Sequence, residues 1–84
     1  MEIPIKISVD FNNCDTEGRV RLNTNGTFED IERLKIKLEP GFKVLLDDNE
    51  GLAINGIVEF SEKENIWVAK FDWDKLNNIF PNID

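Results

Sequence analysis

Apolar and polar residues alternate along the first eleven residues of the chain. This period of two predicts a β-strand over residues 3–11 with one buried face. Pro4 cannot donate a ladder hydrogen bond, so we expect the strand to begin at a sheet edge. A second strand is predicted over residues 17–22, joined to the first by a hairpin. The predicted inward residues of the two strands are Ile3, Ile5, Ile7, Val9, Phe11, Val20 and Leu22.

A short helix is predicted over residues 27–35, after a run of turn-forming residues at 23–26. Thr27 suits the N-cap position, and Arg33 and Lys35 suit the C-terminal end of a helix dipole. Phe28, Ile31 and Leu34 recur at three-residue spacing and would share one face. A helix of about two turns is not stable alone, so we expect it to pack on the sheet.

The second half of the chain predicts a third strand and then a hairpin. Pro40 and Gly41 suit the centre of a type II turn, residues 42–46 form a strand, and residues 47–51 form an acidic turn. Residues 51–73 read as two strands joined by a polar loop at 61–65. Their shared apolar face would hold Leu52, Ile54, Val58, Phe60, Trp67, Ala69, Phe71 and Trp73.

These elements predict one domain over residues 1–84, mainly β (α+β). The favoured fold is a small five-stranded antiparallel SH3-like barrel or bent sheet, with one short helix between the second and third strands. A C-terminal helical turn is expected from Asp74, with Leu76, Ile79 and Phe80 apolar. The alternative is an open antiparallel sheet with the helix on one face.

The charge balance disfavours partners with a dense negative charge. The chain has 17 acidic and 10 basic residues, a net charge of −7. Nucleic acid and anionic membranes attract positive surfaces, so we expect neither as a partner. No apolar run approaches the roughly 18 residues of a membrane span, and the first residues do not resemble a signal peptide. A cytoplasmic location is therefore the expectation, and the lone Cys14 fits a reducing compartment.

The residues that could take part in catalysis or metal binding do not predict an enzyme. There is no histidine, and Cys14 lies between Asn13 and Asp15, with no cation to lower its pKa. A calcium loop counted from Asp47 has the wrong residues at its fifth and twelfth positions. Asp72 and Asp74 flank Trp73, yet a strand residue and a helix cap explain them equally well. We expect no catalytic residue, no cofactor and no metal.

Two further groups suggest binding. Arg19 and Arg21, with Lys6 nearby, could begin a nucleic-acid surface, but pairing with Glu17 or Asp10 is the favoured interpretation. A second set of apolar residues falls on the outer face of the predicted sheet. Either the helix covers this face, or it contacts a protein partner or a second copy of the chain. The predicted interface residues are Leu45, Ile57, Ile66 and Val68.

Several motifs resemble an uncharacterised family of small acidic bacterial proteins, especially cyanobacterial ones. They are residues 21–31 (RLNTNGTFEDI), 39–41 (EPG), 57–60 (IVEF), 67–69 (WVA) and 72–73 (DW). The resemblance spans roughly residues 19 to 75 and implies a shared fold, with no activity attached. Where the family often carries a longer acidic insert, this chain has only residues 47–51.

The sequence therefore predicts a protein that acts by binding. The favoured class is a non-enzymatic small β protein that serves as an interaction module or subunit. The alternative is an acidic inhibitor or immunity-type protein that masks a basic nuclease or nucleic-acid-binding surface.

Overall fold

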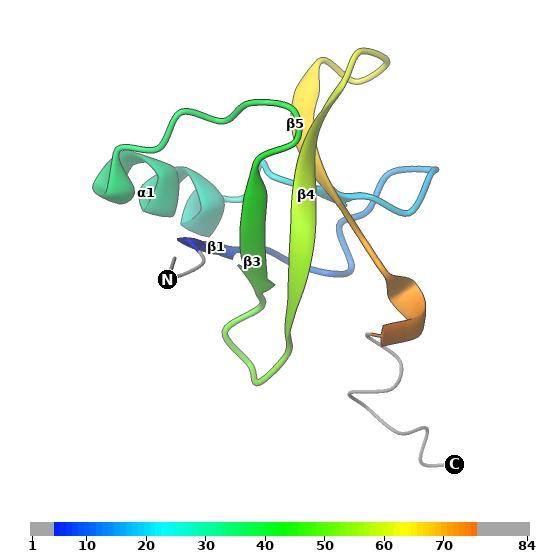
Figure 1. Cartoon of the computed structure of the whole chain (residues 1–84), viewed down its shortest axis with the longest axis horizontal. Helices are drawn as coiled ribbons and strands as arrows, with labels where there is room; N and C mark the ends of the chain where they lie inside the picture. The colour runs from blue at the N-terminus through cyan, green and yellow to red at the C-terminus, as the bar shows by residue number, and fades with distance from the viewer. Residues whose placement is uncertain (1–4, 76–84) are drawn as a thin grey trace.

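The computed structural model describes residues 5–75. Along the chain these residues form β1 (Ile5–Ser8), β2 (Val20–Arg21), α1 (Asn25–Leu34), β3 (Lys43–Asp47), β4 (Ala53–Ser61) and β5 (Ile66–Phe71) (Figure 1). A helical turn over residues 73–75 follows β5. The helix between the second and third strands is confirmed. Ile3 and the predicted helical residues Leu76, Ile79 and Phe80 lie outside the described residues.

The five strands form one mixed sheet in the order β1-β3-β4-β5-β2. The sheet was predicted to be antiparallel, and three of its pairings are, but β1 pairs with β3 in parallel, from Ile5↔Val44 to Ser8↔Asp47. The predicted hairpin between the first two strands was wrong. Residues 13–21 turn back on themselves, with Cys14 bridging Val20, and β2 then pairs with β5.

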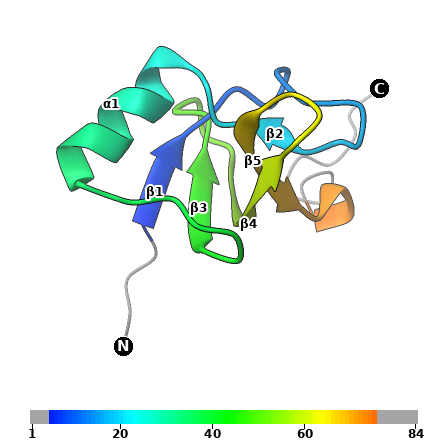
Figure 2. The same cartoon turned by 90° about the horizontal axis from the view of Figure 1, so that it is seen from above.

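The sheet is open, since β1 and β2 lie at its two edges and do not pair with each other. Figure 2 shows it from above, with β1, β3 and β4 at one side and β5 and β2 at the other. β4 joins the two parts: its first half pairs with β3 and its second half with β5, and Gly56 and Ile57 pair with both. A mainly β fold is confirmed, while the SH3-like assignment stays a prediction.

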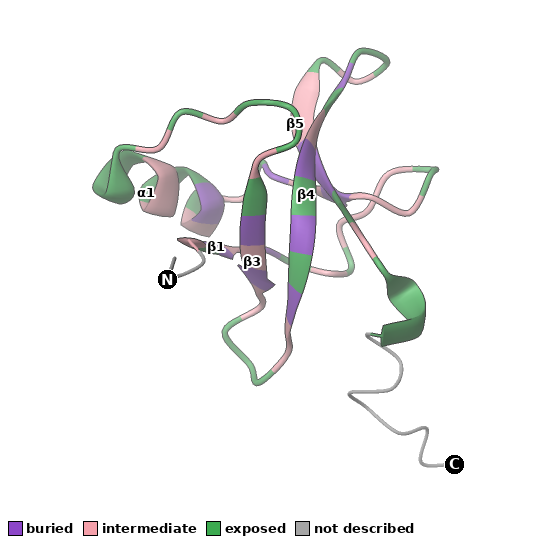
Figure 3. Cartoon of the chain, in the orientation of Figure 1, coloured by how far each residue is buried: buried purple, intermediate pink, exposed green. Residues whose placement is uncertain are grey.

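Strand alternation places the core on one face of this sheet. Along β4, buried and exposed residues alternate from Ile54 to Val58 (Figure 3). The predicted inward positions Ile7, Val9, Val20 and Leu22 are buried. The remaining members of the buried cluster are Val44, Leu46, Ile54, Val58 and Ala69.

The helix begins earlier than predicted. Thr24, and not Thr27, is its N-cap, and the Thr24 hydroxyl accepts a hydrogen bond from the backbone N–H of Thr27. Asn25 and Gly26, predicted as a turn, form the first helical turn instead. Thr27 is completely buried, because its hydroxyl faces β1 and donates to the carbonyl oxygen of Ser8.

The helix lies along the free edge of β1 and does not cover either face of the sheet (Figure 2). Besides the Thr27 bond, the backbone N–H of Ser8 donates to Asp30 at 2.8 Å. Phe28 is 55% exposed and Leu34 41% exposed. The prediction that the apolar face of the helix packs on the sheet was therefore wrong for Phe28 and Leu34, while Ile31 is half-buried. The polar side chains of α1 bond a strand edge instead.

The turns predicted in the second half of the chain are confirmed. Gly41 has φ of +88°, and the backbone N–H of Phe42 donates to the carbonyl of Glu39, as a type II turn requires. β4 and β5 form the predicted antiparallel hairpin, with the loop at residues 62–65. The acidic segment after β3 is also a turn, since Asp47 and Asp48 accept hydrogen bonds from the backbone of Asn49 and Glu50.

Candidate functional site

Three residues form a row across the outer face of the sheet. In the register, Ile57 of β4 lies opposite Lys43 of β3 on one side and Lys70 of β5 on the other. Directly opposed residues share a face, so the isoleucine lies between two lysines. Ile57 is 39% exposed, and both lysines are exposed. We call these three residues the lysine row.

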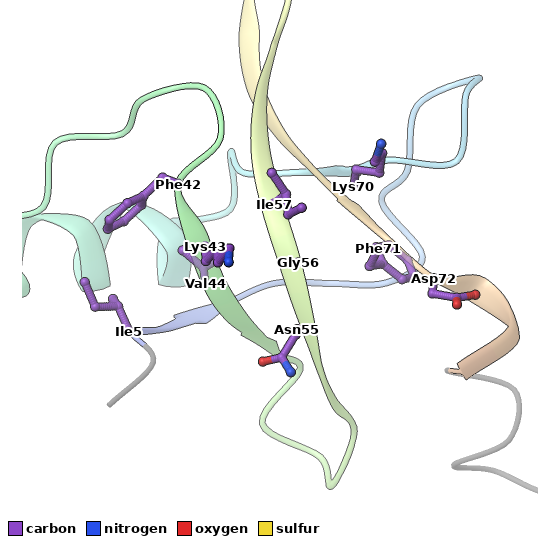
Figure 4. Close-up of a pocket in the computed structure, with 10 residues that line it drawn as sticks. All are labelled: Ile5, Phe42, Lys43, Val44, Asn55, Gly56, Ile57, Lys70, Phe71 and Asp72. Atoms are coloured by element: carbon purple, nitrogen blue, oxygen red, sulfur yellow. The ribbon is translucent and has the colours of Figure 1, made fainter. Parts of the chain in front are cut away.

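A hollow of about 710 Å³ adjoins the lysine row (Figure 4). All three residues of the row line it, together with Phe42, Val44, Phe71 and Asp72 among others. In the register the side chains of Val44 and Phe71 point to the core face, opposite to the row. Its size lies within the range of pockets that hold small molecules or single side chains. On the face of the row, the site therefore combines Ile57 with two lysines and the carboxylate residue Asp72.

The positive charge of the lysine row is not neutralised within the part of the chain that the structure describes. Among the described residues, neither Lys43 nor Lys70 has a carboxylate within ion-pair distance. Lys6 lies on the same face, and its Nζ is 3.9 Å from Oδ2 of Asp47. Asp72, which lines the same hollow, is the nearest acidic residue along the chain to Lys70.

The four predicted interface residues differ in what they offer to a partner. Ile57 is exposed, while Leu45 and Ile66 are half-buried. Val68 has no exposed surface, because it lies between Arg21 and Glu59 in the register and their side chains belong to ion pairs. Leu45 lies opposite Asn55, and Ile66 lies opposite Ser61 at the far end of the hairpin. Ile57 is thus the member that a partner can reach most directly.

The structure places Arg19 and Arg21 in ion pairs. Arg19 donates to Asp15 at 2.9 Å, to Glu59 at 3.1 Å and to the predicted Glu17 at 3.2 Å. The other predicted pairing residue, Asp10, is not a partner. Arg21 donates from two nitrogens to Glu64, both at 2.8 Å. Their guanidinium groups are therefore engaged by the protein's own carboxylates.

These pairs shift the carboxylate pKa values downward. Burial alone would raise the pKa of Asp15, but backbone N–H groups of Arg19 and Glu17 and the Arg19 guanidinium outweigh it and hold the pKa below its usual value. For Glu64 the main cause is the hydrogen bonding from Arg21, which lowers its pKa. Both carboxylates are thus held ionised, as structural groups would be.

The other candidate chemical groups also have structural roles. Burial, and then the nearby Asp15 charge, raises the pKa of Cys14, whose Sγ donates to the carbonyl of Phe11 at 3.2 Å. Asp72 accepts from the backbone N–H of Asp74 and so caps the helical turn at residues 73–75, a role predicted for Asp74. Trp73 between them donates from Nε1 to the carbonyl of Gly18 at 2.8 Å.

A second hollow, of about 460 Å³, lies beside the acidic turn. Val9, Phe11 and Leu52 line it, and Asp10, Asp48 and Glu50 contribute carboxylates. Asp48 is already bonded to the turn, since its Oδ1 accepts from the N–H groups of Glu50 and Leu52. Within residues 5–75, no group of three or more histidine, cysteine or acidic residues is arranged to hold a metal ion.

Comparisons with known proteins identify no relative. The chain matches no protein-family model, and searches of curated proteins and of solved structures find no match. The resemblance to the cyanobacterial family stays a prediction. Among the described residues, no helix has both the length and the apolar composition needed to cross a membrane.

The lysine row was missed by the sequence reasoning, although Ile57 was singled out. Lys43 and Lys70 lie 27 residues apart in the chain, and only the register brings both beside Ile57. Their positions on the polar side of two predicted strands were the available signal. Without the strand order, that signal could not link them.

Proposed function

We propose that this chain is a non-enzymatic protein-interaction module that binds its partner with the outer face of the sheet around Ile57. The observation that carries this proposal is the exposure of Ile57, an apolar residue at the centre of the lysine row on the outer face of the sheet. Because α1 contacts the edge strand β1, it leaves this face free. The SH3-like form of the bent sheet belongs to the same proposal, since it describes the architecture that would present this face.

An exposed apolar residue that serves binding should differ from a core residue in one respect. Its replacement by a polar residue should remove binding and leave the fold intact. Ile57→Lys meets this need, because its side chain would extend into solvent between two exposed lysines. Phe28→Lys on α1 is the matched control, since Phe28 is also an exposed apolar residue but lies away from the lysine row.

The test is a selection of random displayed peptides against the wild-type chain and both variants, with folding checked by circular dichroism. We expect peptides that bind the wild type and Phe28→Lys but not the folded Ile57→Lys chain. Selected peptides that bind all three chains equally, or a selection that enriches none, would contradict the proposal. Unfolding of Ile57→Lys would also contradict it, because Ile57 would then be structural.

A second candidate function, the acidic inhibitor, is favoured by the hollow beside the acidic turn. Asp10 and Glu50 are exposed at this hollow, whose apolar lining could receive the stem of a lysine or arginine from a basic partner. Under this function, the selected peptides would be basic. Asp10→Asn and Glu50→Gln would weaken their binding to the chain, and Ile57→Lys would leave it unchanged. These variants therefore separate the two candidates.

A further inference from the structure

We propose that α1 is a removable cover over a further interaction surface, the edge of β1 that faces away from β3, and that this edge pairs with β1 of a second copy of the chain when α1 moves away. In the strand order this edge is separated from Ile57 of β4 by β3, so the inference goes beyond the proposed function and does not depend on it. Its basis is the way in which α1 is attached to β1.

The backbone of β1 is bonded to another strand on one side only. The N–H of Val9 donates to a carbonyl of β3, so alternate residues of this segment face β3. Lys6 and Ser8 lie between them and turn their backbone groups to the open side, where another strand could pair. At Ser8 this place is taken by α1, because the Thr27 hydroxyl supplies the donor and the Asp30 carboxylate supplies the acceptor (Figure 2).

The attachment of α1 to β1 is mostly polar. Within residues 5–75, β1 is the only strand that α1 contacts, and Thr27 is the only buried residue of the helix. Phe28 and Leu34 are exposed, and Ile31 is half-buried. Segments with few buried apolar contacts open at a lower free energy than the rest of a protein. We therefore expect α1 to detach while the sheet stays folded, which leaves the backbone groups of Ser8 free.

The charges beside this edge suit a second copy of β1 in antiparallel pairing. If Ser8 lies opposite Ser8 of the second copy, each N–H meets the carbonyl of the other, and these two bonds replace those to Thr27 and Asp30. The same register places Lys6 opposite Asp10 of the second copy, and by symmetry it does so twice. Both side chains are exposed, and opposite charges on directly opposed residues stabilise a sheet. A register centred on Lys6 would instead oppose two lysines.

Neither of these side chains is firmly paired within the part of the chain that the structure describes. The Nζ of Lys6 is 3.9 Å from Oδ2 of Asp47, and Asp10 has no cation within ion-pair distance. Both charges are therefore available to a second copy. The bonds from α1 form within one chain, whereas pairing of two copies costs association entropy, so we expect the covered, monomeric form to predominate in the wild type.

Hydrogen exchange of the wild-type chain, in urea below the unfolding transition, tests whether α1 is removable. We expect the amides of α1 and of Ser8 to exchange through a local opening. The amides of Val9 and Val58, which donate to β3 and to Phe42, should exchange only when the whole chain unfolds. If the α1 amides exchange at the same free energy as those two, α1 is an integral part of the fold and the inference is overturned.

Light scattering of the double variant Thr27→Val/Asp30→Ala tests the pairing with a second copy, because this variant lacks both bonds from the helix to the Ser8 backbone. We expect a folded chain whose mass rises from monomer toward dimer as its concentration increases. Adding Lys6→Asp should weaken this dimer about tenfold, since two attractive pairs become repulsive. Adding Asp10→Lys as well should restore the dimer, because the two charges are then exchanged.

Two controls locate the interface of this dimer. Lys63→Asp makes the same charge change in the exposed hairpin loop, and Ile57→Lys changes the outer face, so neither should alter the dimer of the double variant. A double variant that unfolds or stays monomeric would overturn the inference. Equal effects of Lys6→Asp and Lys63→Asp, or a dimer that Ile57→Lys dissociates, would also overturn it, because the interface would then lie elsewhere. The proposed function is tested separately by the peptide selection, so either proposal can fail alone.

Discussion

The hydroxyl group of Thr27 donates a hydrogen bond to the carbonyl oxygen of Ser8, and this bond ties α1 to the edge of the sheet. The hydroxyl has one proton, so the contact of 2.8 Å between the Thr24 and Thr27 hydroxyls must use the Thr24 proton. Asp30 accepts from the N–H of the same Ser8. The helix therefore satisfies both backbone groups of an edge residue that would otherwise be open to another strand.

Thr27→Val tests this attachment, because it keeps the shape of the side chain and removes the hydroxyl. We expect the free energy of unfolding to fall by about 1–3 kcal/mol, since the Ser8 carbonyl loses its buried donor. Urea denaturation measures the change. Thr27→Ser retains the donor and should recover part of the loss; equal stability of the valine variant and the wild type would contradict the account.

Asp30 predicts a dependence of stability on pH. Partial burial raises its pKa, but bonds from Ser8 and from Arg33 lower it further, so the folded pKa lies below the usual value. The unfolded chain then binds more protons between the two pKa values, and stability must decline as the pH falls through this window. The contribution is fully present above about pH 4, the region of the unfolded pKa, and is lost below the folded one.

We therefore expect Asp30→Asn to destabilise the chain most at pH 7 and least at a pH below the lowered folded pKa of Asp30, where the wild-type carboxyl is also neutral. Urea denaturation at a series of pH values gives this difference. Asp74→Asn is the control, because this exposed carboxylate accepts none of the observed hydrogen bonds within residues 5–75. A difference between wild type and Asp30→Asn that stays constant over the whole pH range would contradict the assignment.

Gly56 is needed at the point where β4 pairs with both neighbours. A Cβ atom there would lie 2.6 Å from Cδ1 of Leu46 and 3.1 Å from the carbonyl oxygen of Lys70. Leu46 is completely buried, so its side chain would have to shift within the packed core, and we expect Gly56→Ala to cost about 1–3 kcal/mol. Thermal unfolding checks this value, with the exposed neighbour Asn55→Ala as control. An alanine variant as stable as the wild type would show that the strands can separate locally.

Val68 and Ile57 were predicted to share one apolar patch, but substitutions at the two positions should change the free energy of unfolding by different amounts. Val68 is 0% exposed, so Val68→Ala removes buried methyl groups and should cost roughly 1.5–3 kcal/mol. Ile57→Ala should change the stability by less than about 0.5 kcal/mol, as is usual for a surface substitution. Equal losses in the two variants, measured by urea denaturation, would indicate that Ile57 is also part of the packed structure.

Local sequence patterns predicted the strands and turns better than they predicted which strands pair with each other. The alternation at residues 5–9 and 42–46 and the type II turn at Gly41 depend on neighbours in the chain, and the structure contains all of them. The parallel pairing of β1 with β3 joins segments about 39 residues apart, so no local signal specified it. The helix start was misplaced because Thr24 and Thr27 are both good caps, and only the contact of Thr27 with Ser8 distinguishes them.

The candidate site was predicted only in part, for the same reason. Alternation identified Ile57 as an outer residue of its strand, but the cover over Val68 depends on ion pairs between Arg21 and Glu64 and between Arg19 and Glu59, which link distant segments. The lysine row likewise depends on the register of three strands. Side-chain neighbours across a sheet follow from topology, which periodicity does not encode.

The central claim is that the outer face around Ile57 is a free surface that serves a partner and does not join two copies of the chain. Light scattering of the wild type and of Ile57→Lys, at low and at high salt, tests it most directly. We predict the mass of a monomer, 9.7 kDa, for both chains at both salt concentrations. A wild-type dimer that Ile57→Lys converts into a folded monomer would contradict the claim and assign this face to self-association.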